Sequence, residues 1–263
     1  MTTTYQTPTG PAPNLCLQML REAHILVAGT TGAGKSTLIN AFIYTALYRT
    51  PDELRLVLID PKRVELARWR GLPHTLAYAD EGRGIAETLD RCVALMESRY
   101  RRMQSQGVRA SDEPAVWVIV DELADLITTD RARVEPALVR LAQLGRAANI
   151  HLLLATQTPH RSVITAQIKL NLPCSVALRC RESIESRLVM GCKGAENLPM
   201  HGRGFYASPA FREPTETAIP MISEEDLTAR ESHWRGQGTA RRESPSQGFF
   251  AWLQDLIRKA PRR

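Results

Sequence analysis

The stretch GTTGAGKS at residues 29–36 decides the fold, because it matches the pattern G-x-x-x-x-G-K-[ST] in full. An apolar run, Ile25–Ala28, precedes it, and an amphipathic segment that begins at Lys35 follows it. In this strand–loop–helix setting the glycines let the backbone turn tightly, so that its N–H groups point at a phosphate. The residues expected to bind a nucleotide are Gly29, Thr30, Thr31, Gly32, Ala33, Gly34, Lys35, Ser36 and Thr37.

The side chains of this loop and of a second strand end predict ATP and Mg²⁺ as the ligands. Lys35 can bridge the β- and γ-phosphates, and the Ser36 hydroxyl can ligate Mg²⁺. A further apolar run, Ala115–Val120, leads directly into Asp121 and Glu122. Asp121 can reach the hydrated metal ion there, and Glu122 can act as a general base on the attacking water. The plainer alternative is that the acidic pair only caps the next helix.

Another polar side chain follows a third apolar run. The run Ile150–Thr156 ends in Gln157, which is neutral and can donate and accept hydrogen bonds. We predict that Gln157 senses the γ-phosphate or orients the attacking water. The alternative is an ordinary glutamine on a surface loop.

Short apolar runs alternate with longer segments of helical period from residue 24 to residue 207. Several runs are apolar at consecutive positions, which is typical of strands buried on both faces of a parallel sheet. The pattern predicts an α/β domain of three layers around a mostly parallel central sheet. The expected strands are His24–Ala28, Leu54–Ile59, Val116–Val120, His151–Ala155, Ser175–Leu178 and Gly204–Ala207, and helical stripes lie within residues 38–47, 85–103 and 134–144.

Composition divides the chain into one domain with tails. We expect a flexible lead-in over residues 1–22, which is rich in Thr and Pro, and one α/β domain over residues 23–228. Residues 229–248, rich in Gly, Ser, Arg and Gln, should be a linker. Residues 249–263 should form a basic amphipathic helix. That helix can pack on its own domain or a neighbouring subunit, dock on a protein partner, or lie on an anionic membrane surface.

Length and composition exclude several classes of protein. The chain has 263 residues, of which 43% are hydrophobic and 24% charged, as in ordinary globular proteins. No apolar run approaches the roughly 20 residues of a membrane helix, and the N-terminus lacks the pattern of a signal peptide. We therefore expect no integral membrane segment and a cytoplasmic location. The five cysteines include no C-x-x-C pair, which favours buried thiols over a metal site.

The net charge of +6 is concentrated at the C-terminal end of the chain. Residues 229–263 hold eight Lys and Arg against three Asp and Glu, a net of +5, which leaves about +1 for residues 1–228. Such a tail suits an acidic partner, although basic tails also serve solubility alone.

Together these motifs resemble the FtsK/SpoIIIE family of DNA translocases. The resemblance runs over about residues 23–219, and two of its segments are far more specific than the phosphate-binding loop alone, namely DPK at 60–62 and DELAD at 121–125. The matching segments are LIDPK at 58–62, VIVDELADL at 118–126, LAQLGRAA at 141–148 and ESR at 185–187.

The resemblance implies a RecA-like P-loop NTPase fold, a hexameric ring and duplex DNA threaded through it. ATP would lie between subunits, with an arginine of the neighbouring subunit stabilising the transferring phosphoryl group. Arg146 and Arg187 stand in matching motifs and are the candidates for that arginine. The candidates for contacts with DNA phosphates are Lys62, Arg63, Arg161 and Lys169.

The chain also departs from the family pattern. Thr158 stands where an arginine is usual, Asn149 replaces a glycine, and residues 201–204 replace an acidic, Gly-rich turn. The family's membrane-spanning region, the domain before its motor and its winged-helix module have no counterpart in the sequence. We therefore expect a motor of a mobile element or phage rather than of chromosome segregation.

Two other functions remain open from the sequence. One is an ATPase of the secretion type, which moves polypeptides. The other is an ATP-binding adaptor that recruits partners through residues 249–263. Stimulation of ATP hydrolysis by DNA would separate the translocase from both.

Overall fold

A single central sheet organises the protein, whose computed structural model describes residues 14–237. The sheet has eight strands in the order β3-β2-β4-β5-β1-β6-β7-β8. The first six strands in this order are parallel, and β7 and β8 are added antiparallel at one edge. The strands are β1 (His24–Ala28), β2 (Leu54–Ile59), β3 (Thr75–Ala79), β4 (Ala115–Val120), β5 (Ile150–Thr156), β6 (Cys174–Ala177), β7 (Arg203–Ala207) and β8 (Thr215–Ala218).

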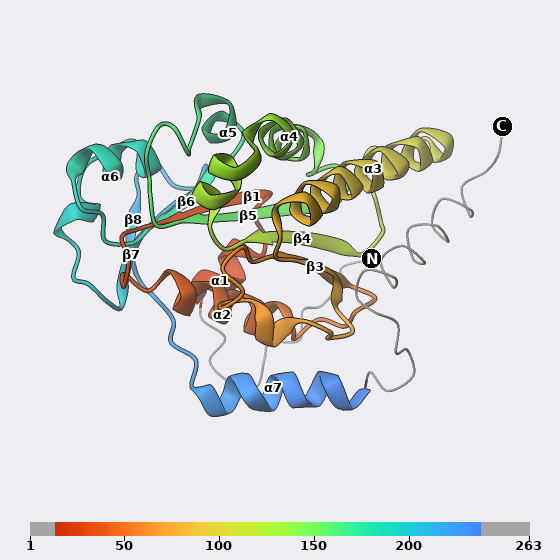
Figure 1. The fold of residues 1–263 in the computed structure, drawn as a ribbon, viewed down its shortest axis with the longest axis horizontal. Helices are drawn as coiled ribbons and strands as arrows, with labels where there is room; N and C mark the ends of the chain where they lie inside the picture. The colour runs from red at the N-terminus through yellow and green to blue at the C-terminus, as the bar shows by residue number, and fades with distance from the viewer. Residues whose placement is uncertain (1–13, 238–263) are drawn as a thin grey trace.

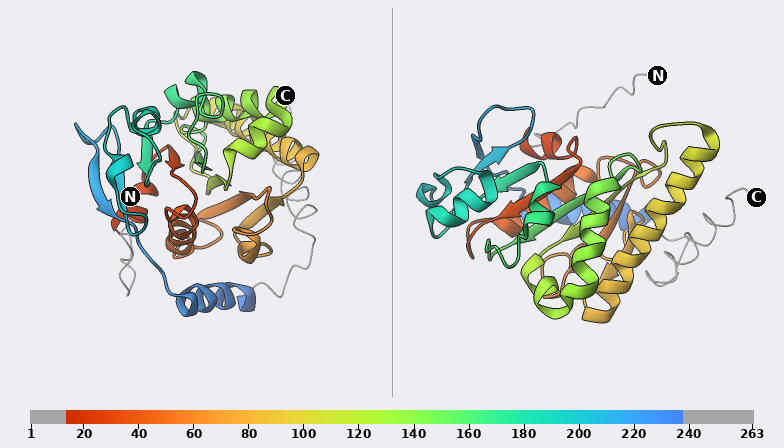
Figure 2. Two further views of the ribbon diagram at one scale, coloured as in Figure 1. Left: turned by 60° about the vertical axis from the view of Figure 1, so that its left-hand side comes forward. Right: turned by 90° about the horizontal axis from the view of Figure 1, so that it is seen from above.

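Helices cover both faces of this sheet, which confirms the predicted three-layer α/β fold (Figures 1 and 2). In Figure 1, α3, α4, α5 and α6 lie above the sheet, and α1, α2 and α7 lie below it. No helix within residues 14–237 has both the length and the apolar character that crossing a bilayer requires. The helices are α1 (Asn14–Met19), α2 (Lys35–Ala46), α3 (Gly82–Gln106), α4 (Leu123–Leu144), α5 (Ala166–Leu170), α6 (Ser183–Met190) and α7 (Glu224–Gln237), with 3₁₀ turns at Ala67–Trp69 and Ala195–Asn197.

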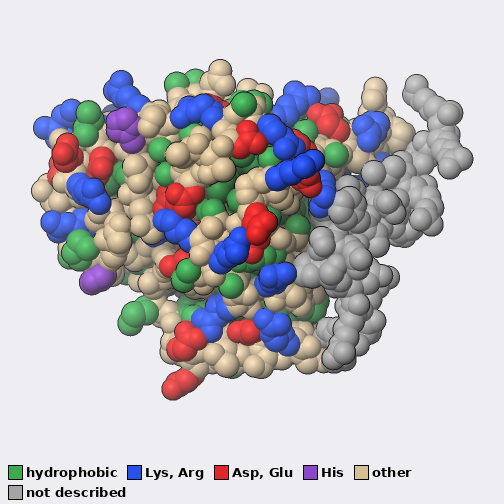
Figure 3. Space-filling view, in the orientation of Figure 1, with side chains coloured by type: hydrophobic (Ala, Val, Ile, Leu, Met, Phe, Trp, Pro, Cys, Tyr) green, Lys and Arg blue, Asp and Glu red, His purple; other side chains and the backbone are tan. Residues whose placement is uncertain are grey.

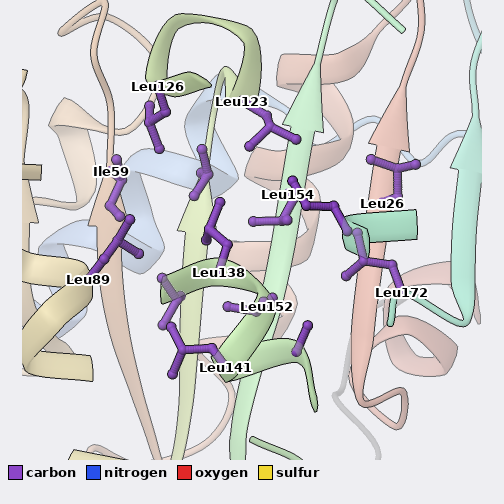
Figure 4. Close-up of a cluster of buried hydrophobic side chains, with 14 of the residues drawn as sticks. Leu26, Ile59, Leu89, Leu123, Leu126, Leu138, Leu141, Leu152, Leu154 and Leu172 are labelled. Atoms are coloured by element: carbon purple, nitrogen blue, oxygen red, sulfur yellow. The ribbon is translucent and has the colours of Figure 1, made fainter. Parts of the chain in front are cut away.

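The continuous apolar character of β1 follows from burial on both faces. Leu26 and Ala28 belong to the core on the α3 and α4 side, whereas Ile25 and Val27 belong to the core on the α2 side. Figure 4 shows the first of these cores, where leucines of α3, α4 and the strands meet. Because β1 lies in the middle of the sheet between β5 and β6, the loop that follows it emerges at the centre of one edge.

All six predicted strands are present, but β3 and β8 were not predicted. Both lie at the two ends of the strand order, where no continuous apolar run is needed. β8 reads TETA and is mostly exposed, and β3 alternates small and partly exposed residues. An edge strand of this kind carries little of the hydrophobic signal on which the prediction depended.

Two segments that were predicted to be a flexible lead-in and a linker contain helices. The end of the predicted lead-in forms α1, in which Cys16 and Met19 are fully buried against the α2 side of the sheet. The first part of the predicted linker is wrong as well, because α7 runs to Gln237. Trp234 anchors α7, since it is buried and its Nε1 donates a hydrogen bond to Leu47 O at 2.9 Å. Residues 1–13 and 238–263, including the predicted helix 249–263, lie outside the described residues.

Candidate nucleotide-binding site

The phosphate-binding loop connects β1 to α2 at the carboxyl edge of the sheet. Gly32 and Gly34 have φ angles of 78° and 99°, a region that glycine enters without steric cost. Gly29 is needed for another reason, because a Cβ there would lie 2.6 Å from Leu178 Cβ. The first turn of α2 has no side-chain cap, so its N–H groups are available to an anion.

Lys35 ties this loop to the end of β4. Its side chain is buried, and its Nζ donates to the backbone O of Asp121 at 2.8 Å and to the Asp121 carboxylate. Burial raises the pKa of Asp121, with Lys35 acting in the opposite direction and the charges of Glu65 and Asp60 adding to the rise. Lys35 and Asp121 therefore meet at the point where the loop faces β4.

The oxygens at this edge fit Mg²⁺. Asp121 Oδ2 and Asp60 Oδ1 are buried acceptors to which no protein donor is bonded. Ser36, at the start of α2, adds a hydroxyl beside the loop. Within residues 14–237, no three His, Cys, Asp or Glu side chains are grouped so that they could hold a metal alone. Mg²⁺ suits such a site, because it is usually bound by one or two carboxylates, waters and substrate phosphates.

Glu122 lies beside Asp121 and is held by several donors. The residue is buried. Thr156 Oγ1 donates to Glu122 Oε1 at 2.6 Å, and Gln157 N lies 3.1 Å from Oε1 and 3.2 Å from Oε2. Lys62 Nζ approaches Oε2 at 3.5 Å. The carboxylate is thus positioned by the ends of three neighbouring strands, β2, β4 and β5.

Gln157 faces the phosphate-binding loop from the end of β5. Its Oε1 accepts a hydrogen bond from Thr31 Oγ1 at 3.0 Å. The backbone N–H of the same residue holds Glu122. Gln157 therefore contacts the loop with its side chain and the candidate base with its backbone, which supports the predicted role near the γ-phosphate.

Of the two candidate arginines, Arg146 does not lie in the site of its own chain. Arg146 follows α4 and precedes β5, at the amino edge of the sheet, where its charge helps to lower the pKa of His24. Arg187 is exposed on α6. A role for Arg146 at a nucleotide therefore requires a second subunit.

Two other arginines near the loop were not predicted. Arg181 Nε donates to Thr30 Oγ1 at 3.1 Å. Arg179 supports the same region, since its O accepts from Thr30 N at 2.8 Å and its Nη1 donates to Leu198 O at 2.6 Å. The signal that could have revealed them is the parallel order of the sheet, which places the segment after β6 beside the loop after β1.

The four residues predicted to contact DNA differ in what they bind. Lys62 and Arg63 lie in the loop after β2, where Arg63 pairs with Glu81 at 2.7 Å. Arg161 is exposed in the loop after β5. Lys169 is a correction, because its ammonium is directed inward and donates to Ser175 Oγ and the Val189 carbonyl. Burial lowers the pKa of Lys169, and we leave it out of the DNA-contacting set.

The charges on the visible face do not form one broad basic patch. In Figure 3, Lys and Arg side chains are interspersed with Asp and Glu across the face drawn in Figure 1. A contact with DNA phosphates on this face would therefore depend on particular loops rather than on a uniform field.

Comparison with known protein families supports the assignment of a nucleotide-binding site to the carboxyl edge of the sheet. The FtsK/SpoIIIE family profile matches residues 10–115 and 109–161. The chain belongs to the FtsK/SpoIIIE family. The match includes the phosphate-binding loop, the acidic pair after β4 and Gln157 after β5.

Curated relatives of this FtsK/SpoIIIE chain are much longer proteins. It is 36% identical over 251 residues to DNA translocase FtsK 1 of Neisseria meningitidis serogroup B, covering 82% of this chain and 31% of that protein. It is 37% identical over 239 residues to DNA translocase FtsK of Streptomyces avermitilis, covering 81% of this chain and 26% of that protein. The chain thus spans about a third or less of the length of these relatives.

Solved structures share the fold. The conjugation coupling protein TcpA of pCW3, in a monomer form with ATPγS, superposes with a TM-score of 0.72 at 22% identity, over 83% of this chain and 66% of that one. EssC (ATPases 2 and 3) of Geobacillus thermodenitrificans gives the same TM-score and identity, over 83% of this chain and 45% of that one. These similarities confirm the fold of P-loop ATPases.

Proposed function

We propose that this chain is the motor part of a DNA translocase, which couples ATP hydrolysis to movement along double-stranded DNA. The observation that carries the proposal is the joint placement of Lys35, Asp121, Glu122 and Gln157 at one edge of the sheet in a chain of the FtsK/SpoIIIE family. The relatives named DNA translocase supply the substrate class. Cytoplasmic ATP and DNA would be its ligands.

The site supports hydrolysis by in-line attack of water on the γ-phosphorus. Lys35 and the N–H groups of the loop would bind the phosphate oxygens, and Ser36 and Asp121 would hold Mg²⁺, which when bound offsets charge on the β- and γ-phosphates. Glu122 would accept the proton of the attacking water as the new O–P bond forms and the bond to ADP breaks. Gln157 and Thr31 would position the γ-phosphate end of the nucleotide.

Assembly into a ring, which we propose to be hexameric, would complete the site. Arg146 lies at the edge of the sheet opposite to the phosphate-binding loop, so it can act only on the nucleotide of a neighbouring subunit. Arg187 on exposed α6 is the other candidate. An arginine supplied in this way would stabilise charge on the transferring phosphoryl group.

Movement of a polypeptide is the second candidate function. The Type VII secretion ATPase EccC of Thermomonospora curvata shares the fold at 22% identity, which is too distant to indicate a substrate. The two curated relatives described above, at 36% and 37% identity, are named DNA translocases, and this favours DNA. The proposed adaptor helix 249–263 lies outside the described residues.

Steady-state ATP hydrolysis by the purified chain, with and without long double-stranded DNA, tests the proposal. We expect strong stimulation by duplex DNA that weakens as salt increases, because contacts with phosphates release counterions. Displacement of a triplex-forming strand would then report movement along the DNA. Hydrolysis that is indifferent to DNA, in protein shown to be assembled, would contradict the proposed substrate.

A further inference from the structure

Lys62 occupies an unusual position for a residue expected only to contact DNA. Its Nζ lies 3.5 Å from Glu122 Oε2 and 3.8 Å from Asp125 Oδ2. The Lys62 side chain is 43% exposed, whereas that of Glu122 is 3% exposed. Lys62 therefore joins the surface of the protein directly to the candidate general base.

The loop that carries Lys62 is held in place at both ends. The buried Asp60 accepts a hydrogen bond from Leu66 N through Oδ2 at 2.9 Å. Arg63 N donates to Asp60 O at 3.0 Å, and the Arg63 side chain binds Glu81. Arg63 has a φ of 60°, a conformation that L residues seldom adopt without such restraints. Residues 60–66 thus form a compact platform that presents Lys62 to Glu122 and to solvent.

Three donors approach the Glu122 carboxylate, and the single N–H of Gln157 is shared between both oxygens, so few acceptor positions remain for water. A carboxylate offers about four lone-pair sites. At Oε1 these are approached by Thr156 Oγ1 and Gln157 N, and at Oε2 by Gln157 N and Lys62 Nζ. A general base must accept a hydrogen bond from the water whose proton it takes. Departure of Lys62, the donor that approaches Oε2 from the surface, would open that oxygen to the attacking water.

Lys62 is the donor that can leave at the least cost. Thr156 is buried and Gln157 uses its backbone N–H, so both are fixed by β5. Lys62 makes the longest of the contacts and lies at the surface. Because the Lys62 side chain is partly exposed, solvent and salt weaken its ion pair, so another anion can take the ammonium.

We propose that Lys62 is a positioning residue that restrains Glu122 until a phosphate of duplex DNA draws its ammonium away. The proposal rests on the proposed function for the identity of the anion. Contact of the loop at residues 60–66 with DNA then frees Oε2 of Glu122 to bind the attacking water. The Lys62 side chain would thus couple the binding of DNA to ATP hydrolysis.

Replacing Lys62 by methionine, which keeps the length and removes the charge, tests the restraint. In Lys62→Met we expect the rate of ATP hydrolysis without DNA to rise about fivefold, the factor that corresponds to an ion pair of this strength. Stimulation by DNA should fall correspondingly, and KM for ATP should change by less than about twofold because Lys62 does not hold the nucleotide. Lys62→Arg should restore both the low basal rate and the stimulation.

Two further variants make the outcome decisive. Lys193→Met, which removes an exposed lysine that the site does not use, should leave both rates unchanged. Lys62→Met combined with Glu122→Gln should be as slow as Glu122→Gln alone, since the gain acts through Glu122. A basal rate in Lys62→Met that is unchanged or lower would overturn the restraint. A KM for ATP raised tenfold would overturn it too, because Lys62 would then be a ligand of the nucleotide.

The basal comparison needs no DNA, so it separates this inference from the proposed function. If wild-type hydrolysis ignores DNA while Lys62→Met still raises the basal rate, the proposed substrate is wrong and the restraint on Glu122 stands. If DNA stimulates the wild type but Lys62→Met changes neither basal rate nor stimulation, the translocase stands and the restraint by Lys62 is wrong.

Discussion

The parallel strands of the central sheet begin along its amino edge and end along the opposite, carboxyl edge. Both of these edges bury charged and polar groups, but the groups serve different purposes. At the amino edge, Arg99 is fully buried and donates to the carbonyls of Ala148, Asn149 and Pro114 at 2.7, 3.1 and 2.8 Å, while Glu113 lies 3.4 Å from its Nε. At the carboxyl edge, Asp60 and Asp121 each keep a buried carboxylate oxygen without a protein donor.

Buried polar atoms without a hydrogen-bond partner differ between the two edges and indicate what each edge does. At the amino edge, Nε2 of His24 has no hydrogen-bond partner, while Nδ1 of the same ring is bonded to the backbone. At the carboxyl edge they are anionic oxygens close to an uncapped helix terminus. A buried acceptor without a donor destabilises the fold, unless it binds a cation or a water molecule that a cation holds. The amino edge thus stabilises the fold, and the carboxyl edge is arranged for ligands.

The largest expected effect is that of Glu122→Gln at the carboxyl edge. The amide keeps the shape and loses the base, so the rate of ATP hydrolysis should fall by about 10²–10⁴-fold. ATP binding and thermal stability should stay close to those of the wild type, as measured by nucleotide titration and thermal unfolding. A near wild-type turnover would mean that Glu122 is not the base.

At the amino edge the expected effect is on stability. Arg99→Met removes the side-chain donor of the Ala148 and Pro114 carbonyls, whereas Asn149 O keeps Val116 N and Glu113 keeps Arg102. The loss should lower the free energy of unfolding by about 3 kcal/mol. For a domain of this size, Tm should fall by about 6–12 °C. Arg140→Met is the matched control, because Arg140 pairs with Glu97 at the surface and should contribute less than about 1 kcal/mol. Equal losses in the two variants would contradict the comparison.

The buried His24 makes the stability of the protein depend on pH. Burial, followed by the charges of His151 and Arg146, lowers the pKa of His24 from 6.5 to about 3. The unfolded chain then binds the proton more readily, so stability is full above pH 6.5 and declines as the pH falls towards 3. Between pH 7.5 and pH 5 the free energy of unfolding should drop by about 2 kcal/mol from this group.

His24→Asn isolates that contribution. The amide oxygen can still accept the hydrogen bond that Leu152 N donates to His24 Nδ1 at 3.1 Å. The difference in unfolding free energy between the two pH values should therefore shrink by about 2 kcal/mol relative to the wild type. An undiminished pH dependence would show that His24 is not held neutral by burial.

The smallest expected effect is a partial recovery of ATP hydrolysis when two inactive variants are mixed. It tests whether the amino edge of one subunit acts on the carboxyl edge of its neighbour. Arg146→Ala and Glu122→Gln should each be inactive alone, but mixed rings contain interfaces with an intact Glu122 and an intact Arg146. Random pairing gives both partners to about a quarter of the interfaces, so partial recovery of ATP hydrolysis is expected. No recovery in rings shown to contain both variants would count against Arg146, and the same experiment then applies to Arg187.

The sequence predicted the carboxyl edge well because parallel strands end together there. Asp121, Glu122 and Gln157 each follow an apolar run, and the rule that strand ends share one edge brings them to the phosphate-binding loop. The same rule could have included Asp60, whose buried oxygen was missed. Asn149, which replaces a family glycine, has a φ of 55°, and its Nδ2 donates to Glu113 O at 2.8 Å, which explains why an asparagine fits this position.

What the sequence could not provide is the direction of individual long side chains. Lys169 was expected at the surface, but its ammonium is directed towards Ser175 and Val189. For Lys62 the only expected role was a contact with DNA. It nevertheless lies beside Glu122, which is 60 residues away along the chain. Trp234 was missed as a core residue because it lies in a polar segment, where one aromatic ring packs among charged neighbours.

Calorimetric titration with ATPγS, in the presence and absence of Mg²⁺, tests most directly that the carboxyl edge is the nucleotide site. The account predicts saturable binding of one nucleotide per chain that strengthens with Mg²⁺ and is lost in Lys35→Ala, while Lys193→Ala binds as the wild type does. Equal binding by Lys35→Ala and the wild type, or binding that ignores Mg²⁺ in both, would contradict it.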